Sequence, residues 1–141
     1  MRISVQKEDF DVSSEIKKIS GDNKIGAVAT FIGLVREVEM TLEHYPGMTE
    51  RALEKIAAEA GSRWQVMDCT VIHRYGALKP KDQIVLVAVA SAHRGDAFAA
   101  CEFIMDFLKT QAPFWKKEQG ADGARWVEAK AADDEAAGRW K

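Results

Sequence analysis

The pattern of apolar and polar residues divides the chain into predicted strands. Continuous apolar runs at residues 25–35 and 84–90 have the length and the branched side chains of strands that are covered on both faces. Shorter strands are predicted at residues 2–5 and 66–73. Residues 38–42 alternate apolar and polar side chains, which is the period of a half-exposed strand.

Apolar residues at helical spacing predict helices between these strands. The two longest are expected after Thr49 and Asp96, and a short one after Ser13, because each of these residue types accepts hydrogen bonds from a first helical turn. A short strand is expected at residues 125–129 and a polar helix at residues 133–140. Strands and helices are mixed rather than strictly alternating, so we expect an α+β fold.

The segment from Ile25 to Tyr45 contains no turn signal, although about ten residues is the usual upper length of a strand. Two explanations are open. Either a tight hairpin lies near Glu37, or residues are missing between Arg36 and Met40.

Length and composition indicate a single domain spanning residues 1–141. A chain of 141 residues with 47% hydrophobic content buries about two-thirds of its unfolded surface, enough to fold without a metal or a disulfide. Cys69 and Cys101 form no CxxC pair and lie in apolar runs, which favours reduced core thiols and a cytoplasmic protein. No apolar run reaches the roughly 20 residues that cross a bilayer.

The overall charge limits the kind of anion recognition that the chain can perform. A net charge of -2 and a pI near 5.9 disfavour broad electrostatic binding of nucleic acid. Any site for an anion must therefore be a local cluster of basic groups.

Most of the candidate chemistry lies between Ser91 and Lys117. His93 and Arg94 come where a predicted strand passes into a helix, and the N–H groups and dipole at such a helix start favour an anion. Lys109 is expected at the edge of the apolar stripe of that helix, partly desolvated. Burial and like-charge repulsion are the two effects that turn a lysine into a proton carrier near neutral pH.

Each of these residues taken alone also has an ordinary explanation. His93 is a common type of structural hydrogen-bonding residue, and Arg94 and Lys117 are common solvated surface charges. His73 and Arg74 are interpreted as structural or surface groups rather than catalytic ones.

Five segments carry a family resemblance. They are TLEHYPGMTE at 41–50, VIHRYGAL at 71–78, SAHR at 91–94, FIMDFLKTQAPFWKKE at 103–118 and RWVEAK at 125–130. In this order they resemble the large, catalytic subunit of molybdopterin synthase, and the match runs from about Gly26 to Trp140. Several long motifs in register make this resemblance far more specific than any single motif.

The resemblance implies a fold, a reaction and partners. The implied fold is an α/β hammerhead with an added small antiparallel β-subdomain. The implied enzyme is a sulfurtransferase of molybdenum cofactor biosynthesis that converts cyclic pyranopterin monophosphate into molybdopterin. The sulfur would arrive as a thiocarboxylate on the C-terminus of a small ubiquitin-like subunit, and two large subunits would form the centre of a heterotetramer. The absence of a cysteine motif fits a chain that receives its sulfur from outside.

The resemblance also assigns site residues and implies neither a cofactor nor a metal. Lys109 and Lys116 correspond to the catalytic positions. The implied substrate-binding residues are Leu34, Val35, Arg36, His93, Arg94, Lys109, Lys116, Lys117, Glu118 and Lys130. Part of each pocket is expected to come from the other large subunit.

Two departures from the family pattern affect these assignments. Only residues 37–40 separate Arg36 from TLEHYPGM, where the family usually has several more residues. Lys130 stands where many relatives carry arginine, so the charge is kept but the bidentate donor pair is lost. A non-catalytic anion-binding or adaptor module, or a purely structural subunit, would be compatible with the composition alone.

Overall fold

The computed structural model describes residues 1–120, 123–127 and 137–140, with side chains described at 1–116 and 137–140. Within these residues the chain forms three α-helices and two four-stranded β-sheets, a mixed fold as expected. The elements in chain order are β1 (Arg2–Gln6), α1 (Val12–Ile19), β2 (Ala27–Leu34), β3 (Met40–His44), α2 (Met48–Arg63), β4 (Asp68–Arg74), β5 (Gly76–Leu78), β6 (Gln83–Ser91), α3 (Arg94–Gln111), β7 (Phe114–Gly120) and β8 (Gly123–Val127).

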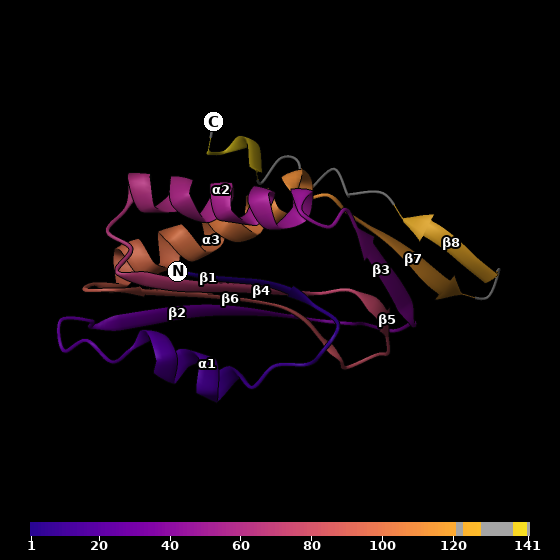
Figure 1. Cartoon of the computed structure of the whole chain (residues 1–141), viewed down its shortest axis with the longest axis horizontal. Helices are drawn as coiled ribbons and strands as arrows, with labels where there is room; N and C mark the ends of the chain where they lie inside the picture. Colours follow the sequence, from indigo (N-terminus) through magenta and orange to yellow (C-terminus); the bar gives the residue numbers. More distant parts are fainter. Residues whose placement is uncertain (121–122, 128–136, 141) are drawn as a thin grey trace.

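The two sheets have different roles in the architecture. The larger sheet has the strand order β1-β4-β6-β2, and the smaller sheet has the order β5-β3-β7-β8. β1 pairs in parallel with β4, and the other pairs are antiparallel. Helices α2 and α3 cover one face of the larger sheet and α1 covers the other (Figure 1). The smaller sheet lies beyond the end of the larger sheet at which α3 ends (Figure 1).

Strand β6 is the centre of the core, as its apolar sequence predicted. All of its residues from Val85 to Ser91 are buried, and they alternate between two apolar clusters. Val85, Val87 and Val89 pack with α2 and α3, whereas Leu86, Ala88 and Ala90 pack with Ile19 of α1. Full burial of each valine or leucine contributes roughly 1.5–3 kcal/mol relative to exposure. A strand covered on both faces therefore makes the larger sheet a rigid base.

The helices begin earlier than the sequence indicated. α1 is capped by Asp11, whose side chain accepts from Ser14 N, and not by Ser13. α2 starts after Gly47, and α3 starts after His93. The predicted caps were wrong, and two of these side chains have other partners. Buried Thr49 donates its hydroxyl to Tyr45 O, and Asp96 accepts from Gln65 N in a neighbouring loop.

Strand β2 is an edge strand and not the doubly covered strand that its apolar sequence predicted. It pairs only with β6 within the described residues. Three of its large apolar side chains are exposed: Phe31 (41%), Ile32 (37%) and Leu34 (55%). An exposed apolar edge is a typical surface for association with another chain.

The connection between β2 and β3 is a tight turn at Glu37. The Val38 N–H donates to Arg36 O at 2.8 Å, and Glu37 has a φ of 72°. This γ-type turn closes the connection without further residues. It is not a hairpin, because β2 pairs with β6 and β3 pairs with β5 and β7. The alternating segment predicted at residues 38–42 forms β3 two residues later.

The smaller sheet was largely missed by the sequence patterns. Neither β5 nor β7 was predicted, and β8 covers Gly123–Val127 where residues 125–129 were expected. Val35, Met40, Leu42 and Leu78 form a separate buried cluster beneath it. This cluster joins the smaller sheet to the end of the larger one.

The end of the chain docks on its own helices. Trp140 contacts the rings of Trp64 and Phe103 at centroid distances of 5.5 and 5.8 Å, and its indole N–H donates to Asp106. Half of the helix predicted at residues 133–140, residues 133–136, lies outside the described residues. In residues 1–120, 123–127 and 137–140, no helix combines the length and the apolar character that a bilayer span requires.

Candidate functional site

The C-terminal end of α3 lies where the two sheets meet. α3 folds back along β6, and Cys101 Sγ, midway along the helix, contacts Val87 O at 3.8 Å. The last turn of the helix carries Lys109, and Pro113 follows its end. The chain then enters β7 of the smaller sheet at Phe114. Lys109 is exposed in the single chain, so the partial desolvation expected for it was wrong.

Lys116 lies on the inner face of the smaller sheet. Across the β3–β7 pair, Lys116 is opposite Leu42 and Phe114 is opposite His44. Opposed residues, and residues two apart on one strand, share a face of a sheet. Leu42 is buried in the cluster beneath this sheet. Partly buried Lys116 and the Phe114 ring therefore belong to the same inner face.

His73 packs against Phe114 at this junction. The two rings are stacked, with centroids 3.7 Å apart and planes at 19°. Nδ1 of His73 donates to Arg74 O at 2.9 Å. The pKa of His73 is lowered to about 4, chiefly by burial and also by the nearby Lys109 and His44, and the hydrogen bond to Arg74 O opposes this shift. His73 is thus a buried neutral ring close to Lys109, which confirms its interpretation as a structural group.

His44 has a fixed orientation near Phe114, with ring centroids 5.9 Å apart. Its Nδ1 lies 3.0 Å from Thr49 Oγ1, which donates its only proton to Tyr45 O. Nδ1 must therefore carry a proton and donate to Thr49. Glu50 Oε1 is 4.0 Å from the same nitrogen and is buried without a hydrogen-bond partner. The His44 ring thus has a defined tautomer, and motif spacing gave no signal of this arrangement.

His93 and Arg94 lie at the opposite end of α3. Both are exposed, and His93 is the N-cap residue with extended backbone and no side-chain cap hydrogen bond. Arg94 and Lys109 are fifteen residues apart on one helix, which corresponds to about 22 Å along its axis. The sequence placed these groups in one passage of chain, but a single folded chain does not bring them together.

Arg36 lies toward the Lys109 end of the molecule. Leu34 pairs with Gln83 at the start of β6, and α3 ends over that same end of the sheet because it runs back along β6. Arg36 and Leu34 are exposed. Val35 is buried, its N–H donates to Asp82 O and its carbonyl accepts from Lys81 N. Val35 therefore presents no unused backbone group to a ligand in this conformation.

Three predicted site residues are described only in part or not at all. Lys117 and Glu118 belong to β7, where their backbones pair with Thr41 and Met40, but their side chains are outside the described part of the chain. Lys130 lies wholly outside the described residues. Among the side chains that are described, no group of three or more His, Cys, Asp or Glu residues is placed to hold a metal ion.

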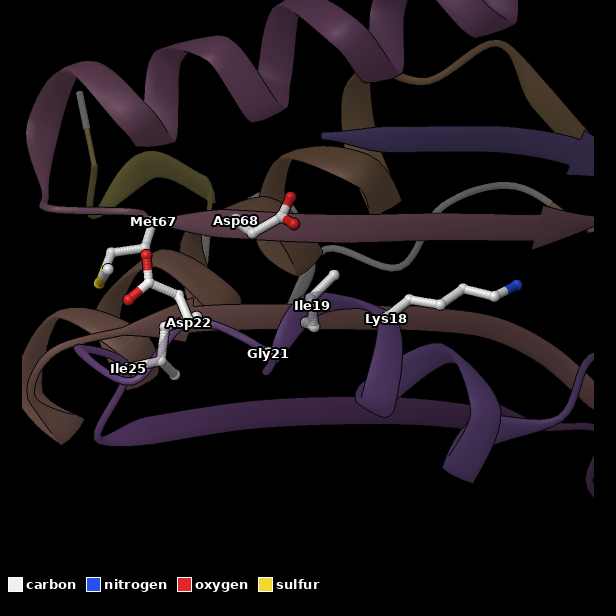
Figure 2. Close-up of a pocket in the computed structure, with 7 residues that line it drawn as sticks. All are labelled: Lys18, Ile19, Gly21, Asp22, Ile25, Met67 and Asp68. Carbon is white, nitrogen blue, oxygen red and sulfur yellow. The ribbon is translucent and has the colours of Figure 1, made fainter.

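A hollow of about 250 Å³ opens elsewhere on the surface (Figure 2). It lies between the end of α1 and the start of β4, and Lys18, Asp22 and Asp68 are its charged lining residues. Asp68 is already engaged by the N-terminal ammonium group at 3.1 Å and by Cys69 N–H at 2.8 Å. None of the predicted site residues lines this hollow.

Comparison with known proteins agrees with the resemblance seen in the motifs. The family described as "MoaE protein" matches residues 5–111. A molybdopterin synthase catalytic subunit of Ralstonia nicotianae is 60% identical, covering 98% of this chain and 83% of that protein. The same-named protein of Cereibacter sphaeroides is 53% identical, covering 99% of this chain and 100% of that protein. The latter alignment spans 146 residues, more than this chain contains, so that relative has residues without a counterpart here.

Solved structures give the same result for the fold. The molybdopterin biosynthesis MoaE protein from Burkholderia ambifaria superposes with a TM-score of 0.87 at 59% identity, covering 99% of this chain and 98% of that one. Molybdopterin synthase from Staphylococcus aureus superposes with a TM-score of 0.82 at 33% identity, covering 87% and 94% respectively.

Proposed function

The chain belongs to the MoaE protein family, and we propose that it is the catalytic subunit of a molybdopterin synthase. As such it is a sulfurtransferase of molybdenum cofactor biosynthesis. It transfers two sulfurs from a thiocarboxylated protein C-terminus to cyclic pyranopterin monophosphate. The observation that carries this proposal is the placement of Lys109 and the Lys116 strand around one rigid junction, at the motif positions that the family resemblance assigns to catalysis.

Lys109 and Lys116 act on the reacting groups in this proposal. Both the thiocarboxylate and the cyclic phosphate are anions, so two ammonium groups at one junction can orient them and offset charge that develops during transfer. The same groups can donate and accept protons as sulfur adds and oxygen leaves. Lys109 lies on α3 and Lys116 lies on β7. Placement on two regular elements suits such positioning.

The remaining basic residues hold the substrate. Arg36 and Arg94 suit the cyclic phosphate, because a guanidinium can donate two parallel hydrogen bonds. His93 adds a donor at the start of α3, where the helix dipole favours an anion. The proposed substrate contacts also include Leu34, Lys117, Glu118 and Lys130. Buried Val35 instead holds the segment between Leu34 and Arg36 through its backbone hydrogen bonds.

The site requires a second copy of the chain. His93 and Arg94 lie about 22 Å from Lys109 along α3, too far to share one small substrate. The exposed apolar edge of β2 offers a way to close that distance. Antiparallel pairing of two β2 edges would bring the Leu34 end of one chain to the Ala27 end of its partner.

This pairing would complete the site from two directions. Gly26, which precedes β2, donates its N–H to Ser91 O, so the start of β2 lies beside the start of α3. The partner's His93 and the partner's Arg94 would then approach the end that carries Arg36 and Lys109. The backbones at Gly26 and Ala92 lie so close that only glycine fits at position 26, because a Cβ there would lie 2.4 Å from Ala92 O.

A small sulfur-carrier subunit and a cytoplasmic location complete the proposal. The relatives are named catalytic subunits, and this chain has only two cysteines, both buried and free. The sulfur therefore comes from a partner, which we take to be the small ubiquitin-like subunit. The smaller sheet at the end of the larger one supports an α/β-hammerhead-like domain over residues 1–141 with an added β-subdomain.

Reconstitution tests the activity. The purified chain is mixed with a thiocarboxylated small subunit and the cyclic pterin, and molybdopterin is measured. Product that requires both additions supports the proposal. Binding of the small subunit without product would instead indicate a non-catalytic adaptor.

Mixed dimers test the shared site. Lys116→Ala and Arg94→Ala chains, each inactive alone, are unfolded together, refolded and assayed. If each site takes Lys116 from one chain and Arg94 from the other, a mixed dimer keeps one intact site. Random assortment then restores about one quarter of wild-type activity, by the assortment of subunits in a twofold dimer. If both residues came from the same chain, every site would be defective and no activity would return.

A further inference from the structure

Phe114 links the two elements that carry the catalytic lysines. Lys109 precedes it by five residues on α3, and Lys116 follows it by two residues on β7. α3 packs on the larger sheet, whereas β7 belongs to the smaller sheet. The relative position of the two lysines therefore depends on how Phe114 is held where the chain crosses from one sheet to the other.

Two imidazoles hold the Phe114 ring. His73, on β4 of the larger sheet, stacks on it at 3.7 Å, and His44, on β3 of the smaller sheet, lies 5.9 Å away at 37°. His44 is further fixed by Thr49 through Nδ1 and by Tyr75, whose ring centroid is 4.5 Å away. One ring from each sheet thus contacts the same side chain. We call His44, His73 and Phe114 the imidazole clamp.

We propose that the imidazole clamp sets the distance between Lys109 and Lys116, which makes His44 and His73 positioning residues for sulfur transfer. This inference rests on the proposed function for its link to catalysis. A displacement of about 1 Å in a reacting group can lower a rate by about 100-fold. A contact that fixes a catalytic group on α3 relative to one on β7 therefore affects turnover more than substrate binding.

The charge state of His73 agrees with this role. Its ring is neutral near pH 7, because burial lowers its pKa to about 4. A protonated ring would repel nearby Lys109, whereas a neutral ring stacks on Phe114 without competing for the anionic substrate. Lys109 of α3 and His44 of β3 are the charged or titratable groups that act on His73, and Glu50 of α2 lies 4.0 Å from His44.

Paired substitutions at His73 test the clamp in the reconstituted enzyme. His73→Phe keeps a flat ring against Phe114, and His73→Ala removes it. We expect His73→Ala to lower kcat by about 10- to 100-fold with KM changed by less than about threefold. His73→Phe should restore kcat to within about threefold of the wild type, since it replaces the stacking ring.

Trp64→Leu is the matched control for a purely structural effect. Trp64 also makes aromatic contacts, with Phe103 and Trp140, but at a different part of the fold. We expect the Trp64→Leu substitution to lower Tm and to leave kcat per folded molecule unchanged. Equal kcat losses in Trp64→Leu and His73→Ala, or a His73→Ala enzyme with wild-type kcat, would overturn the inference.

A distance measurement tests the clamp without any activity. Spin labels are attached to the Lys109→Cys, Lys116→Cys double variant, and the distance distribution is measured by pulsed electron paramagnetic resonance. The native thiols should not react, because both are buried, and burial raises the pKa of Cys69 and raises that of Cys101 to about 12.

The distribution should be narrow, should broaden with His73→Ala, and should remain narrow with His73→Phe. An unchanged distribution in His73→Ala would refute the clamp even if the wild type makes product. A broadened distance distribution in His73→Ala would support the clamp even if the wild type made no molybdopterin. Failure of the clamp and failure of the proposed function are therefore distinguishable.

Discussion

The two ends of α3 carry two groups of proposed site residues, and they differ in how they are supported. At the C-terminal end, the helix passes through Pro113 into β7, and aromatic and imidazole rings from both sheets fix that passage. At the N-terminal end, His93 and Arg94 are exposed and make no side-chain hydrogen bond or ion pair among the described residues. The first end is organised within one chain. In the proposed dimer, the second is completed by another chain.

The strongest test of this difference is removal of a lysine from the organised end. Lys109→Ala and Lys116→Ala should each lower kcat by roughly 10²–10⁴-fold, the usual contribution of a positioned proton-transfer group. Tm should change little, because Lys109 is exposed and Lys116 is only partly buried. Steady-state molybdopterin formation and a thermal melt measure the two effects.

Lys55→Ala provides the control for loss of a lysine as such. Lys55 is an exposed residue of α2, away from the passage between the sheets. The Lys55→Ala variant should therefore keep the turnover of the wild type. Near wild-type turnover in either Lys109→Ala or Lys116→Ala would remove that lysine from the mechanism.

A smaller effect expected at the organised end is a pH dependence of the free energy of unfolding. The pKa of His73 falls from 6.5 to about 4 on folding, chiefly through burial. Between these values the unfolded chain binds more protons than the folded chain, so stability decreases as the pH is lowered from 6.5 toward 4. The full loss is on the order of 3 kcal/mol from this group. Urea unfolding of the wild type and His73→Phe over this range measures it.

The variant should lose this part of the pH dependence, because phenylalanine has no proton to bind. The carboxylate of Asp9 acts in a lower range, since the hydrogen bond from Gln83 lowers its pKa below 3.8. Identical pH profiles for the two proteins would show that His73 does not titrate as its burial indicates.

The smallest expected effect concerns the turn that brings Arg36 toward the organised end. Glu37 has a φ of 72°, a conformation that glycine adopts without a steric penalty. Glu37→Gly should raise the free energy of unfolding by up to about 1 kcal/mol. Glycine relieves backbone strain in the folded chain, and we expect this gain to exceed the stabilisation of the unfolded chain by its added flexibility. Urea unfolding at pH 7 is a sufficient measurement. Destabilisation would mean that the Glu37 side chain supports the turn.

The larger sheet was predictable because its signals are local. The run at residues 84–90 identified β6, and helical spacing identified α2 and α3. β2 was misjudged as covered on both faces, because an apolar edge strand and an apolar central strand have the same sequence pattern. β7 was missed because FWKKEQG lacks both alternation and a continuous apolar run.

The site was predictable only in its parts. The basic residues were found from their types and motifs. Because Arg94 and Lys109 lie in one short segment of sequence, they were expected to lie close together, but α3 separates them. The imidazole clamp was not predicted at all. His44, His73 and Phe114 come from three strands that are far apart in sequence, and only strand pairing brings them together. Pairing of this kind has no local signal.

The order of strands in the two sheets has a consequence for synthesis on the ribosome. Every strand of the larger sheet has been made once Ser91 has left the ribosome, whereas β3 must wait for Phe114 and the residues after it before it gains β7 as a neighbour. Chains are synthesised from the N-terminus and begin to fold before they are complete. Once α3 has followed and covered the larger sheet, that part of the molecule can therefore fold before β7, the strand that carries Lys116, has been made. A nascent or truncated chain should then acquire a stable body before it acquires the proposed site.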